Sequence, residues 1–478
     1  MKLSKLIEGI NGIVSVNFQD IEITSVTAIS SRCRAGSLFV AINGSRFKGA
    51  DFVLSAHDLG ARAFVSSEKL PKLKNSVFIY SKCPRKTLAE LCANLNGNPE
   101  KKLLFVGITG TKGKTTTAAF LSNILDGLGV KNIVVGTLGI KGTGHGETQN
   151  TTPDPTVLFP LFKSAYRQGV KVVILEVSSQ ALKDFRVYGI PFDCVAFTGL
   201  GHDHIGENEH PSVSDYIFSK RSLFNSYGAK RAVVNSDDPY SSYMTADVPK
   251  VTRCGFSGNS DLVIKDFKDS PGGASFKLGG AQVVCSLPGI YNARNISLAL
   301  ALAREVSGCS IHEAAKHVSK TTVPGRFNYI DFYGRNIVID YAHNQESMRE
   351  IINLSRSLFG KKIFCVFGSV GDRSFVRRRE LATVSEELAD FSVITSDNPG
   401  YEMPLSICTD IYSAFKDKTK AKIIVDRAEA INYAIREAKV GDSVLILGKG
   451  HETSINVCGK IIPFSDADVV EKLKREAL

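Results

Sequence analysis

The sequence predicts an α/β protein of three domains, in which a central parallel sheet carries a glycine-rich phosphate loop. Three observations predict this fold class. The chain has 478 residues, more than one ordinary domain holds. Short apolar runs of strand type alternate with helical stretches, the pattern of a parallel sheet with helices on both faces. A glycine turn at residues 107–117 stands between one such strand and a helix start.

The order of the apolar runs sets the predicted domains. Residues 1–100 form a small α/β unit, residues 101–325 the central sheet, and residues 326–478 a third α/β set. In the first domain we expect strands at 37–42 and 61–65. In the second we expect them at 132–135, 172–175, 194–197 and 231–235, followed by a glycine-rich hairpin at 270–280. In the third we expect them at 336–340, 362–367, 391–395, 421–425 and 443–447.

The composition is that of an ordinary globular protein, with 43% apolar and 22% charged residues. Ten cysteines are scattered singly without a C-x-x-C pair, which predicts reduced thiols and a cytoplasmic protein. Residues 1–20 lack the apolar core of a signal peptide, and we expect no membrane span because no apolar run is long enough. The net charge of +11 suits anionic partners but does not separate nucleic acid from nucleotides or acidic metabolites.

The stretch Gly-Ile-Thr-Gly-Thr-Lys-Gly-Lys-Thr-Thr-Thr at residues 107–117 predicts a nucleotide-phosphate site. It lies between an apolar run and a helix-compatible segment, 118–128, so free backbone N–H groups and a helix N-terminus face an anion. In such a loop Lys114 reaches the terminal phosphates and the Thr115 hydroxyl holds Mg²⁺. The usual G-x-x-x-x-G-K-[ST] spacing wants glycine where this chain has Ile108, which leaves a tighter loop.

The acidic partner of the loop is expected at the end of a neighbouring strand, because Mg²⁺ prefers carboxylate oxygen. Glu176 fits, since it ends the apolar run 171–175. A solvated glutamate at a strand end is the alternative interpretation. His202, Asp203 and His204 form a second candidate metal group, although two histidines without cysteines make a weak zinc site.

Ten motifs occur in an order that makes the chain similar to a known family. They are Gly110-Thr-Lys-Gly-Lys-Thr-Thr, Asn150-Thr-Thr-Pro-Asp-Pro, Glu176-Val-Ser-Ser-Gln-Ala-Leu, Tyr216-Ile-Phe-Ser-Lys220-Arg-Ser-Leu-Phe, Gly289-Ile-Tyr-Asn-Ala-Arg-Asn295, Pro324-Gly-Arg326-Phe, Asp340-Tyr-Ala-His343, Gly371-Asp-Arg373, Asp397-Asn-Pro and Gly448-Lys-Gly-His-Glu452. Together they resemble the Mur ligases of peptidoglycan synthesis, and among these the MurE type. The resemblance spans nearly the whole chain and is highly specific, because the motifs keep their order.

The resemblance implies an ATP-driven ligase that joins a diamino acid to UDP-N-acetylmuramoyl-L-alanyl-D-glutamate through an acyl phosphate, releasing ADP and phosphate. It implies a UDP-binding N-terminal domain, a central P-loop ATPase sheet and a C-terminal Rossmann-like domain that binds the amino acid. ATP and Mg²⁺ are the expected cofactors, and we expect a monomer with no nucleic-acid or membrane partner. Because a carboxylate and a γ-phosphate must meet, the site needs concentrated positive charge.

The residue roles that the resemblance implies fall into four groups. The catalytic positions are Lys114, Glu176, His204, Lys220 and Arg326, and the metal positions are Thr115, Glu176, His204 and Lys220, the last carbamylated to N6-carboxylysine. ATP is expected at Gly110, Thr111, Lys112, Gly113, Lys114, Thr115, Thr116, Asn292, Asn295, Arg326 and Asp340. The UDP-muramoyl dipeptide is expected at Ile29, Ser31, Ser45, Asn150, Thr151, Thr152, Ser178, Asp184 and Arg186. The amino acid is expected at Arg373, Asp397, Asn398, Pro399, Gly400, Gly448 and Glu452.

Three residues depart from the family pattern. Gly199 stands where asparagine is usual, and Asp184 stands where a glutamine often contacts the sugar dipeptide. Gly400 matters most, because relatives that use meso-diaminopimelate carry arginine there against its distal carboxylate, whereas lysine-adding relatives tend to have a small residue. A buried carboxylate that loses its charged partner costs about 2–5 kcal/mol. The sequence therefore favours L-lysine, unless Arg373 or Arg377 supplies the charge.

Other functions stay open at this point. Folylpolyglutamate synthase and the other Mur ligases share the phosphate loop but match fewer motifs, and a similar ligase acting on a different acid and amine is the nearest rival. A basic P-loop ATPase acting on nucleic acid needs a basic stripe with interleaved aromatics, and the clearest basic run, residues 377–379, is isolated. A catalytically inactive nucleotide sensor is disfavoured, because Lys114, Glu176, His204 and Lys220 are all present.

Overall fold

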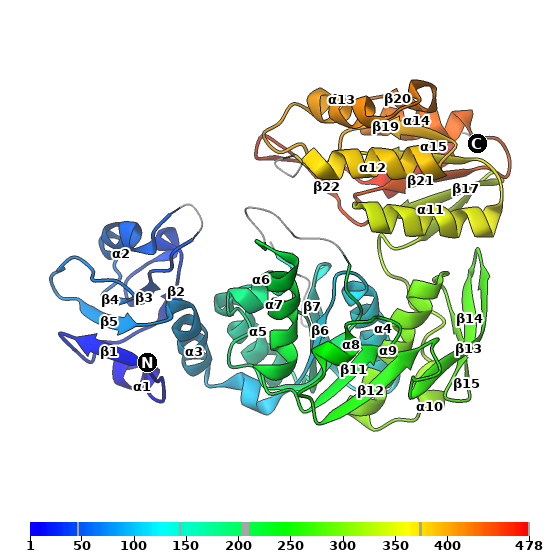
Figure 1. Cartoon of the computed structure of the whole chain (residues 1–478). Coiled ribbons are helices and arrows are strands. Elements are labelled where there is room, and N and C mark those ends of the chain that lie inside the picture. Colours follow the sequence, from blue (N-terminus) through cyan, green and yellow to red (C-terminus); the bar gives the residue numbers. More distant parts are fainter. Residues whose placement is uncertain are drawn as a thin grey trace. The chain divides into compact units, whose positions relative to one another are not determined.

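The computed structural model describes residues 1–44, 47–142, 146, 148, 150–201, 210–371 and 375–476. Figure 1 labels the helices and strands along the chain. The chain divides into two compact units, of which the first holds residues 1–200, 204–263 and 297–314 and the second holds residues 201–203, 264–296 and 315–478. Strands alternate with helices in both units, which confirms the predicted α/β class.

The N-terminal part of the first unit is a five-stranded sheet. Its elements are α1 (Leu3–Leu6), β1 (Ile13–Val16), β2 (Ser25–Thr27), β3 (Ser37–Val40), α2 (Val53–Asp58), β4 (Ala63–Ser66), β5 (Val77–Ser81) and α3 (Pro84–Asn96), with 3-10 turns at Ser30–Arg32, Gly49–Phe52 and Pro99–Lys102. The strand order is β1-β5-β4-β3-β2, and only the β1–β5 pair is antiparallel among these described strands. Strands β3 and β4 are wholly buried, as their apolar sequences predict.

The rest of the first unit is built on the strands that the apolar runs predict. Its elements are β6 (Leu104–Thr109), α4 (Lys114–Gly127), β7 (Asn132–Gly136), β8 (Gly139–Lys141), α5 (Pro155–Arg167), β9 (Val172–Glu176), α6 (Ser179–Lys183), β10 (Phe192–Phe197), α7 (Val213–Asn225), β11 (Arg231–Asn235), α8 (Ser241–Met244), β12 (Lys250–Gly255) and α10 (Ile311–Ala315). Neighbouring strands run in the order β12-β11-β10-β6-β9-β7-β8, all parallel except β8. The carboxyl ends of the parallel strands therefore meet at one edge.

The second unit contains a six-stranded sheet and two smaller antiparallel sets. The elements are β13 (Leu262–Ser270), β14 (Gly273–Leu278), β15 (Ala281–Cys285), β16 (Asn328–Phe332), β17 (Arg335–Asp340), α11 (Gln345–Phe359), β18 (Ile363–Phe367), α12 (Phe375–Leu388), β19 (Phe391–Ile394), α13 (Pro404–Ala414), β20 (Ala421–Ile423), α14 (Arg427–Glu437), β21 (Ser443–Leu447), β22 (Ser454–Val457), β23 (Lys460–Pro463) and α15 (Asp466–Glu476), with a 3-10 turn at Lys418–Lys420. Strand β13 and helix α9 (Ile290–Ser307) each span the boundary of the two units, as does α10 at its last residue. The sheet order is β16-β17-β21-β18-β19-β20, and β16 alone of these strands is antiparallel to its neighbour.

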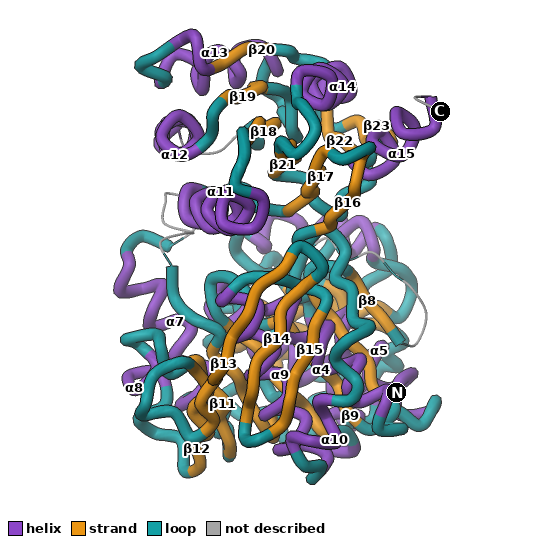
Figure 2. Tube along the Cα trace, turned by 90° about the vertical axis from the view of Figure 1, so that its right-hand side faces the viewer, coloured by secondary structure: helices purple, strands orange, loops and turns teal. Residues whose placement is uncertain are grey.

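The faces of this six-stranded sheet are covered by different helices. Helices α11, α12 and α13 pack beside one another on one face, and α14 packs with α15 on the other, as Figure 2 shows for α11 and α12 against α15. Local signals match the observed helix ends. Asn344 and Ser347 form a capping box before α11, and Gly360, at φ 67°, ends that helix.

Two sequence expectations need correction. The helix after the phosphate loop begins at Lys114, four residues before the predicted start, because Gly113 (φ 84°) caps it and the threonines fit in its first turns. The predicted hairpin at 270–280 is two successive turns, since β13 pairs with β14 and β14 pairs with β15. The ten cysteines are all in described residues and are unpaired. No helix in the described part of the chain has both the length and the apolar character to cross a bilayer.

Candidate active site

The phosphate loop connects β6 to α4 with the geometry that its glycines predict. Gly110 has φ 149°, and a Cβ there would lie 1.9 Å from the Thr198 hydroxyl oxygen. Gly113 takes the left-handed conformation directly before the helix. The backbone N–H groups of Lys114 and its neighbours open α4, so the loop presents the positive end of a helix to an anion.

Two lysines meet on one carbonyl oxygen of this loop. Lys114 Nζ donates to the oxygens of Gly110 at 2.8 Å and Thr111 at 3.1 Å. Lys220 Nζ, on a side chain only 1% exposed, donates to the same Gly110 oxygen at 3.0 Å. Tyr216 fixes the second lysine, because its ring centroid lies 4.4 Å from Lys220 Nζ and its hydroxyl bonds that of Thr111 at 2.9 Å. Like charges held this close repel unless one is neutralised or an anion is present.

Glu176 lies beside the loop, at the end of β9, and is 1% exposed. Its Oε2 accepts hydrogen bonds from the Thr115 hydroxyl at 2.9 Å and the Thr137 hydroxyl at 3.1 Å, and its Oε1 accepts from the Thr137 N–H at 3.1 Å. A Cβ on Gly136 would lie 2.1 Å from Oε1, so the carboxylate needs glycine there. Sequence reasoning missed Thr137, although its place after the parallel strand β7 was a usable signal.

The donor set at this point fits Mg²⁺. The Thr115 hydroxyl and the Glu176 carboxylate are hard oxygen donors in contact, and a P-loop Mg²⁺ takes its remaining ligands from phosphate and water. The described residues contain no group of three or more His, Cys, Asp or Glu side chains placed to hold a metal. The predicted His204, with His202 and Asp203, lies outside the described residues.

Three residues predicted for the acid substrate stand next to Glu176. The Thr152 hydroxyl donates to the Glu176 carbonyl at 2.8 Å and accepts from the Ser178 N–H at 3.1 Å. Ser178 caps α6 through its hydroxyl, which accepts from the Ala181 N–H. The Thr151 hydroxyl bonds that of Thr137 at 3.2 Å. Asn150 is exposed nearby along the chain.

Asp184, one of the departures, is tied into an ion-pair set. Its Oδ2 lies 3.1 Å from Arg186 Nη2, and its Oδ1 lies 3.3 Å from Arg85 Nη1. Arg186 also donates to the Thr152 carbonyl at 3.1 Å. Two cations thus share one carboxylate beside the predicted acid site. Of the other predicted residues, Ile29 and Ser31 are exposed and Ser45 lies outside the described residues.

Gly199, the second departure, is accommodated by its surroundings. Its φ is 139°, a value that glycine adopts without strain. Its carbonyl accepts from the Thr111 N–H at 2.9 Å. The following amide, of Leu200, donates to Asp238 Oδ2 at 2.7 Å. The hydrogen bonding of this loop is therefore supplied by Asp238, which the sequence did not single out.

Four of the predicted ATP residues lie in the second unit. Asn292 and Asn295 are buried in the first turns of α9. Asp340 ends β17 and accepts from the Phe327 and Ala342 N–H groups, both at 2.8 Å. The Arg326 guanidinium lies 4.9 Å from the Tyr341 ring centroid.

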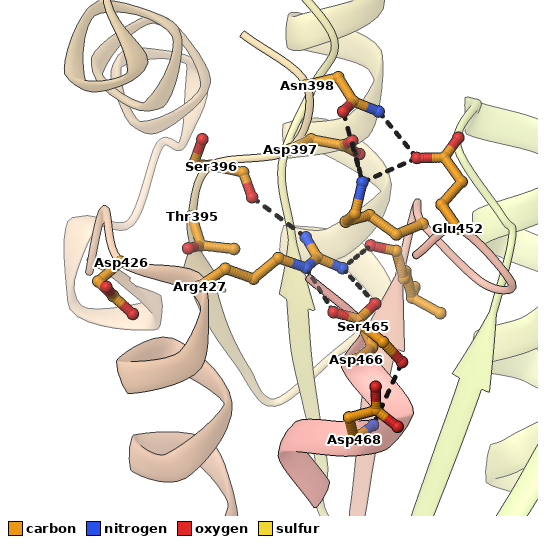
Figure 3. A network of polar contacts seen from close by, with 12 residues as sticks. Thr395, Ser396, Asp397, Asn398, Asp426, Arg427, Glu452, Ser465, Asp466 and Asp468 are labelled. Atoms are coloured by element: carbon orange, nitrogen blue, oxygen red, sulfur yellow. Dashed lines mark hydrogen bonds and ion pairs between the residues drawn. The ribbon is translucent and has the colours of Figure 1, made fainter. Parts of the chain in front are cut away.

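The predicted amino-acid residues that the structure describes follow the carboxyl ends of β19 and β21, and Figure 3 labels Asp397, Asn398 and Glu452 among them. Asn398 Nδ2 donates to Glu452 Oε2 at 2.8 Å. A Cβ on Gly448, whose φ is 109°, would lie 2.6 Å from Asp397 Oδ2. Burial raises the pKa of Asp397, and the nearby Arg427 and Lys449 charges oppose that rise. Pro399 and Gly400 follow in the same loop, and Arg373 lies outside the described residues.

Arg427 is a residue that the motifs did not reveal. Its guanidinium pairs with the buried Asp466 carboxylate at 2.7 and 2.8 Å and also donates to the carbonyls of Ser396 and Leu447. These carbonyls directly precede Asp397 and Gly448, so Arg427 holds the two loops at a set spacing. The role of Arg427 is visible only in the tertiary structure, because its partners are far away in sequence.

The middle arginine of the basic run at residues 377–379 is buried. Arg378 is 1% exposed and pairs with Glu402 at 2.8 Å and Asp410 at 2.7 Å. It therefore anchors the segment after Gly400 to α12 and α13. This is the role of a structural ion pair.

Comparison with known proteins finds one family along the chain. The Mur ligase middle domain matches residues 108–303, the Mur ligase glutamate ligase domain residues 325–450, and the Mur ligase family catalytic domain residues 22–94. Among the relatives named UDP-N-acetylmuramoyl-L-alanyl-D-glutamate–2,6-diaminopimelate ligase, two serve as examples. The one from Bacillus licheniformis is 35% identical over 99% of both chains, and the one from Geobacillus kaustophilus 36% identical over 100% of both. A solved structure of a protein with that name superposes with a TM-score of 0.69 at 26% identity, covering 100% of this chain and 99% of its own.

Proposed function

The chain belongs to the Mur ligase family, whose members are ATP-dependent amide ligases, and on this premise we propose that it adds a diamino acid to UDP-N-acetylmuramoyl-L-alanyl-D-glutamate. The acid is proposed from the names that its relatives carry. The observation that supports the catalytic part is the contact of Thr115 with Glu176. It lies beside the phosphate loop, whose Gly110 carbonyl accepts from both Lys114 and Lys220.

The chemistry explains why these groups are needed. A carboxylate is a poor electrophile at neutral pH, so a carboxylate oxygen first attacks the γ-phosphorus of ATP, and ADP leaves with the electron pair of the broken P–O bond. The amine then attacks the carbonyl carbon of the acyl phosphate, phosphate leaves with the electron pair of the C–O bond, and the amine loses a proton. Each step brings anions together, so fixed positive charge lowers the barrier.

The described residues divide this work. Lys114 exchanges its two carbonyl partners for the terminal phosphates, and the loop amides bind the remaining phosphate oxygens. Thr115 and Glu176 would hold Mg²⁺, with His204 as a further predicted ligand. When bound, Mg²⁺ neutralises phosphate charge and helps to align the γ-phosphate for transfer.

Carbamylation of Lys220 is part of the proposal. An unmodified Lys220 places a second ammonium on the Gly110 oxygen that Lys114 already contacts. A carbamate would replace that repulsion with an oxygen ligand for a metal. A Lys220→Ala variant is expected to lose activity and to regain it with added short carboxylates, measured as phosphate release. Full activity without any addition would contradict the modification.

The acceptor that we propose is L-lysine, although the relatives are named for 2,6-diaminopimelate. Gly400 has no side chain to pair with a distal carboxylate, and its φ of 59° is one that other residues adopt only with strain. Its N–H donates to the Asn456 carbonyl at 3.2 Å and its carbonyl accepts from the Cys458 N–H at 2.7 Å, which ties this backbone to the β22–β23 hairpin. The nearby Arg378 is engaged with Glu402 and Asp410.

One assay tests the reaction. Phosphate release is measured with ATP, Mg²⁺ and the UDP-muramoyl dipeptide over a panel of amino acids, and we expect release with L-lysine. Absence of release with every amine would refute the proposed reaction. Release with meso-diaminopimelate alone would refute the choice of lysine and leave the ligase reaction standing.

A pair of variants isolates the role of position 400. Gly400→Arg is expected to raise the use of meso-diaminopimelate relative to L-lysine, because it restores a cation to the distal carboxylate. Gly400→Ala is the matched control, since it carries the same backbone strain without the charge. An equal change in both variants would show that strain and not charge determines the result.

A further inference from the structure

Lys449 is a fully buried cation to which the proposed reaction assigns no role. It follows Gly448 at the end of β21, and its side chain is 0% exposed. Burying an ammonium is costly unless its charge is paired and its N–H groups are hydrogen-bonded. Its position inside the amino-acid group therefore calls for an explanation.

The partners of Lys449 come from both loops of the amino-acid group. Its Nζ lies 2.7 Å from Glu452 Oε2, 3.4 Å from Asn398 Oδ1 and 3.9 Å from Asp397 Oδ1. Asn398 in turn donates from Nδ2 to Glu452 Oε2 at 2.8 Å. Lys449, Asn398 and Glu452 thus form a closed triangle of polar contacts, of which Figure 3 labels Asn398 and Glu452.

This triangle treats the two oxygens of Glu452 differently. Oε2 accepts from both Lys449 and Asn398. Oε1 has no hydrogen-bond partner within the described part of the chain, and the side chain is 30% exposed. A carboxylate pinned through one oxygen presents the other in a fixed direction, which suits an incoming ammonium or amine.

We infer that Lys449 is a positioning residue that holds Glu452 so that Oε1 receives the amino group of the incoming amino acid. The inference rests on the proposed function and on the role that the family resemblance implies for Glu452, a contact with that amino acid. Lys449 itself does not touch the substrate and acts through Glu452. Arg427 stabilises the contact of Lys449 with Glu452 indirectly. It donates to the Ser396 and Leu447 carbonyls and so fixes the starts of the same two loops.

The test compares Lys449→Met with wild type by steady-state phosphate release. We expect the KM for the amino acid to rise about 10- to 100-fold, the size of effect that a misplaced positioning group has. The KM values for ATP and for the UDP-muramoyl dipeptide are expected to stay unchanged. Lys449→Arg should recover part of the loss. Lys472→Met is the matched control, because Lys472 is an exposed lysine 3.7 Å from Glu476 in the same unit.

A double variant shows whether Lys449 works through Glu452. If it does, Lys449→Met/Glu452→Gln has the same amino-acid KM as Glu452→Gln alone, because the effects are not additive. This comparison also replaces the single variant if Lys449→Met does not fold, since the double variant leaves no Glu452 charge without its partner. A further rise of KM in the double variant, or an unchanged KM in a folded Lys449→Met, would overturn the inference. Wild-type activity is measured first, so its absence over the whole amino-acid panel counts against the proposed function itself.

Discussion

The phosphate loop and the amino-acid group hold their carboxylates in opposite ways. At the loop, the contacts of Glu176 are with neutral donors, the hydroxyls of Thr115 and Thr137 and one backbone N–H. In the C-terminal group, fixed cations hold the carboxylates, with Arg427 on Asp466 and Lys449 on Glu452. In the described contacts of Glu176, no cation of the protein neutralises the carboxylate, so its charge is available to a bound metal ion. In the C-terminal group, Arg427 and Lys449 already neutralise the carboxylates that they contact.

This difference separates stability from activity. A carboxylate that is paired with a buried cation contributes to folding, and removal of the cation leaves a buried charge. Replacing a lysine that donates to backbone carbonyls has little effect on folding. It lowers activity, however, because the bound phosphate loses a positive charge. Each variant is therefore measured through the quantity, stability or activity, that it is expected to change most.

The largest effect is expected for Arg427→Met. It leaves the 0%-exposed Asp466 carboxylate without its partner, so the free energy of unfolding should fall by about 3–5 kcal/mol. Urea denaturation followed by circular dichroism measures this. Arg427→Met/Asp466→Leu is the control and should recover most of the loss, because an apolar pair often replaces a buried ion pair without cost. An unchanged urea midpoint in Arg427→Met would show that the Arg427–Asp466 pair does not stabilise the fold.

Lys114→Met should have the reverse effect. Phosphate release is expected to fall about 10²–10³-fold, the cost of losing one donor aimed at developing charge. The free energy of unfolding should change by no more than about 1 kcal/mol, because the hydrogen bonds of Lys114 to the Gly110 and Thr111 carbonyls are of a kind that water can replace. A large loss of stability with this variant would remove the contrast between the two regions.

The smallest effect concerns His210, a buried histidine in the unit that holds the phosphate loop. Its Nδ1 lies 2.6 Å from Asp215 Oδ2 and its Nε2 lies 2.9 Å from the Ser179 hydroxyl. Burial lowers the pKa of His210, and the bond to Asp215 only partly opposes this. The folded pKa lies below the unfolded one, so this contribution to stability is present above the unfolded value of about 6.5 and is lost as pH falls through the folded pKa.

The pH dependence can be checked directly. Urea midpoints of wild type and His210→Gln are compared between about pH 7 and pH 5, where histidine titrates. Wild type should lose more stability on acidification than the variant, because glutamine does not titrate. Parallel curves for the two proteins would mean that His210 carries no such linkage.

Sequence reasoning predicted the parts of the site whose residues are adjacent in the chain or directly follow a strand. The glycines, Lys114 and Thr115 are adjacent in the chain, and Glu176 follows a buried strand, so strand ends and loop spacing predicted their meeting. Thr137 obeys the same rule at the end of β7 and was missed only because threonine carries a weaker signal than glutamate. The match of the family models along the chain agrees with the ordered motifs.

The sequence by itself determined the α/β class, the phosphate loop and the identity of the polar groups, because burial pattern and turn chemistry are local. Only the tertiary structure decided which of these groups face one another. Strand β6 lies between β10 and β9, which are not its neighbours in sequence, and this order brings Lys220 to Gly110. The placement of β21 between β17 and β18 likewise brings Lys449 to Asn398. Such contacts depend on strand order, which is a property of the whole chain and leaves no local trace.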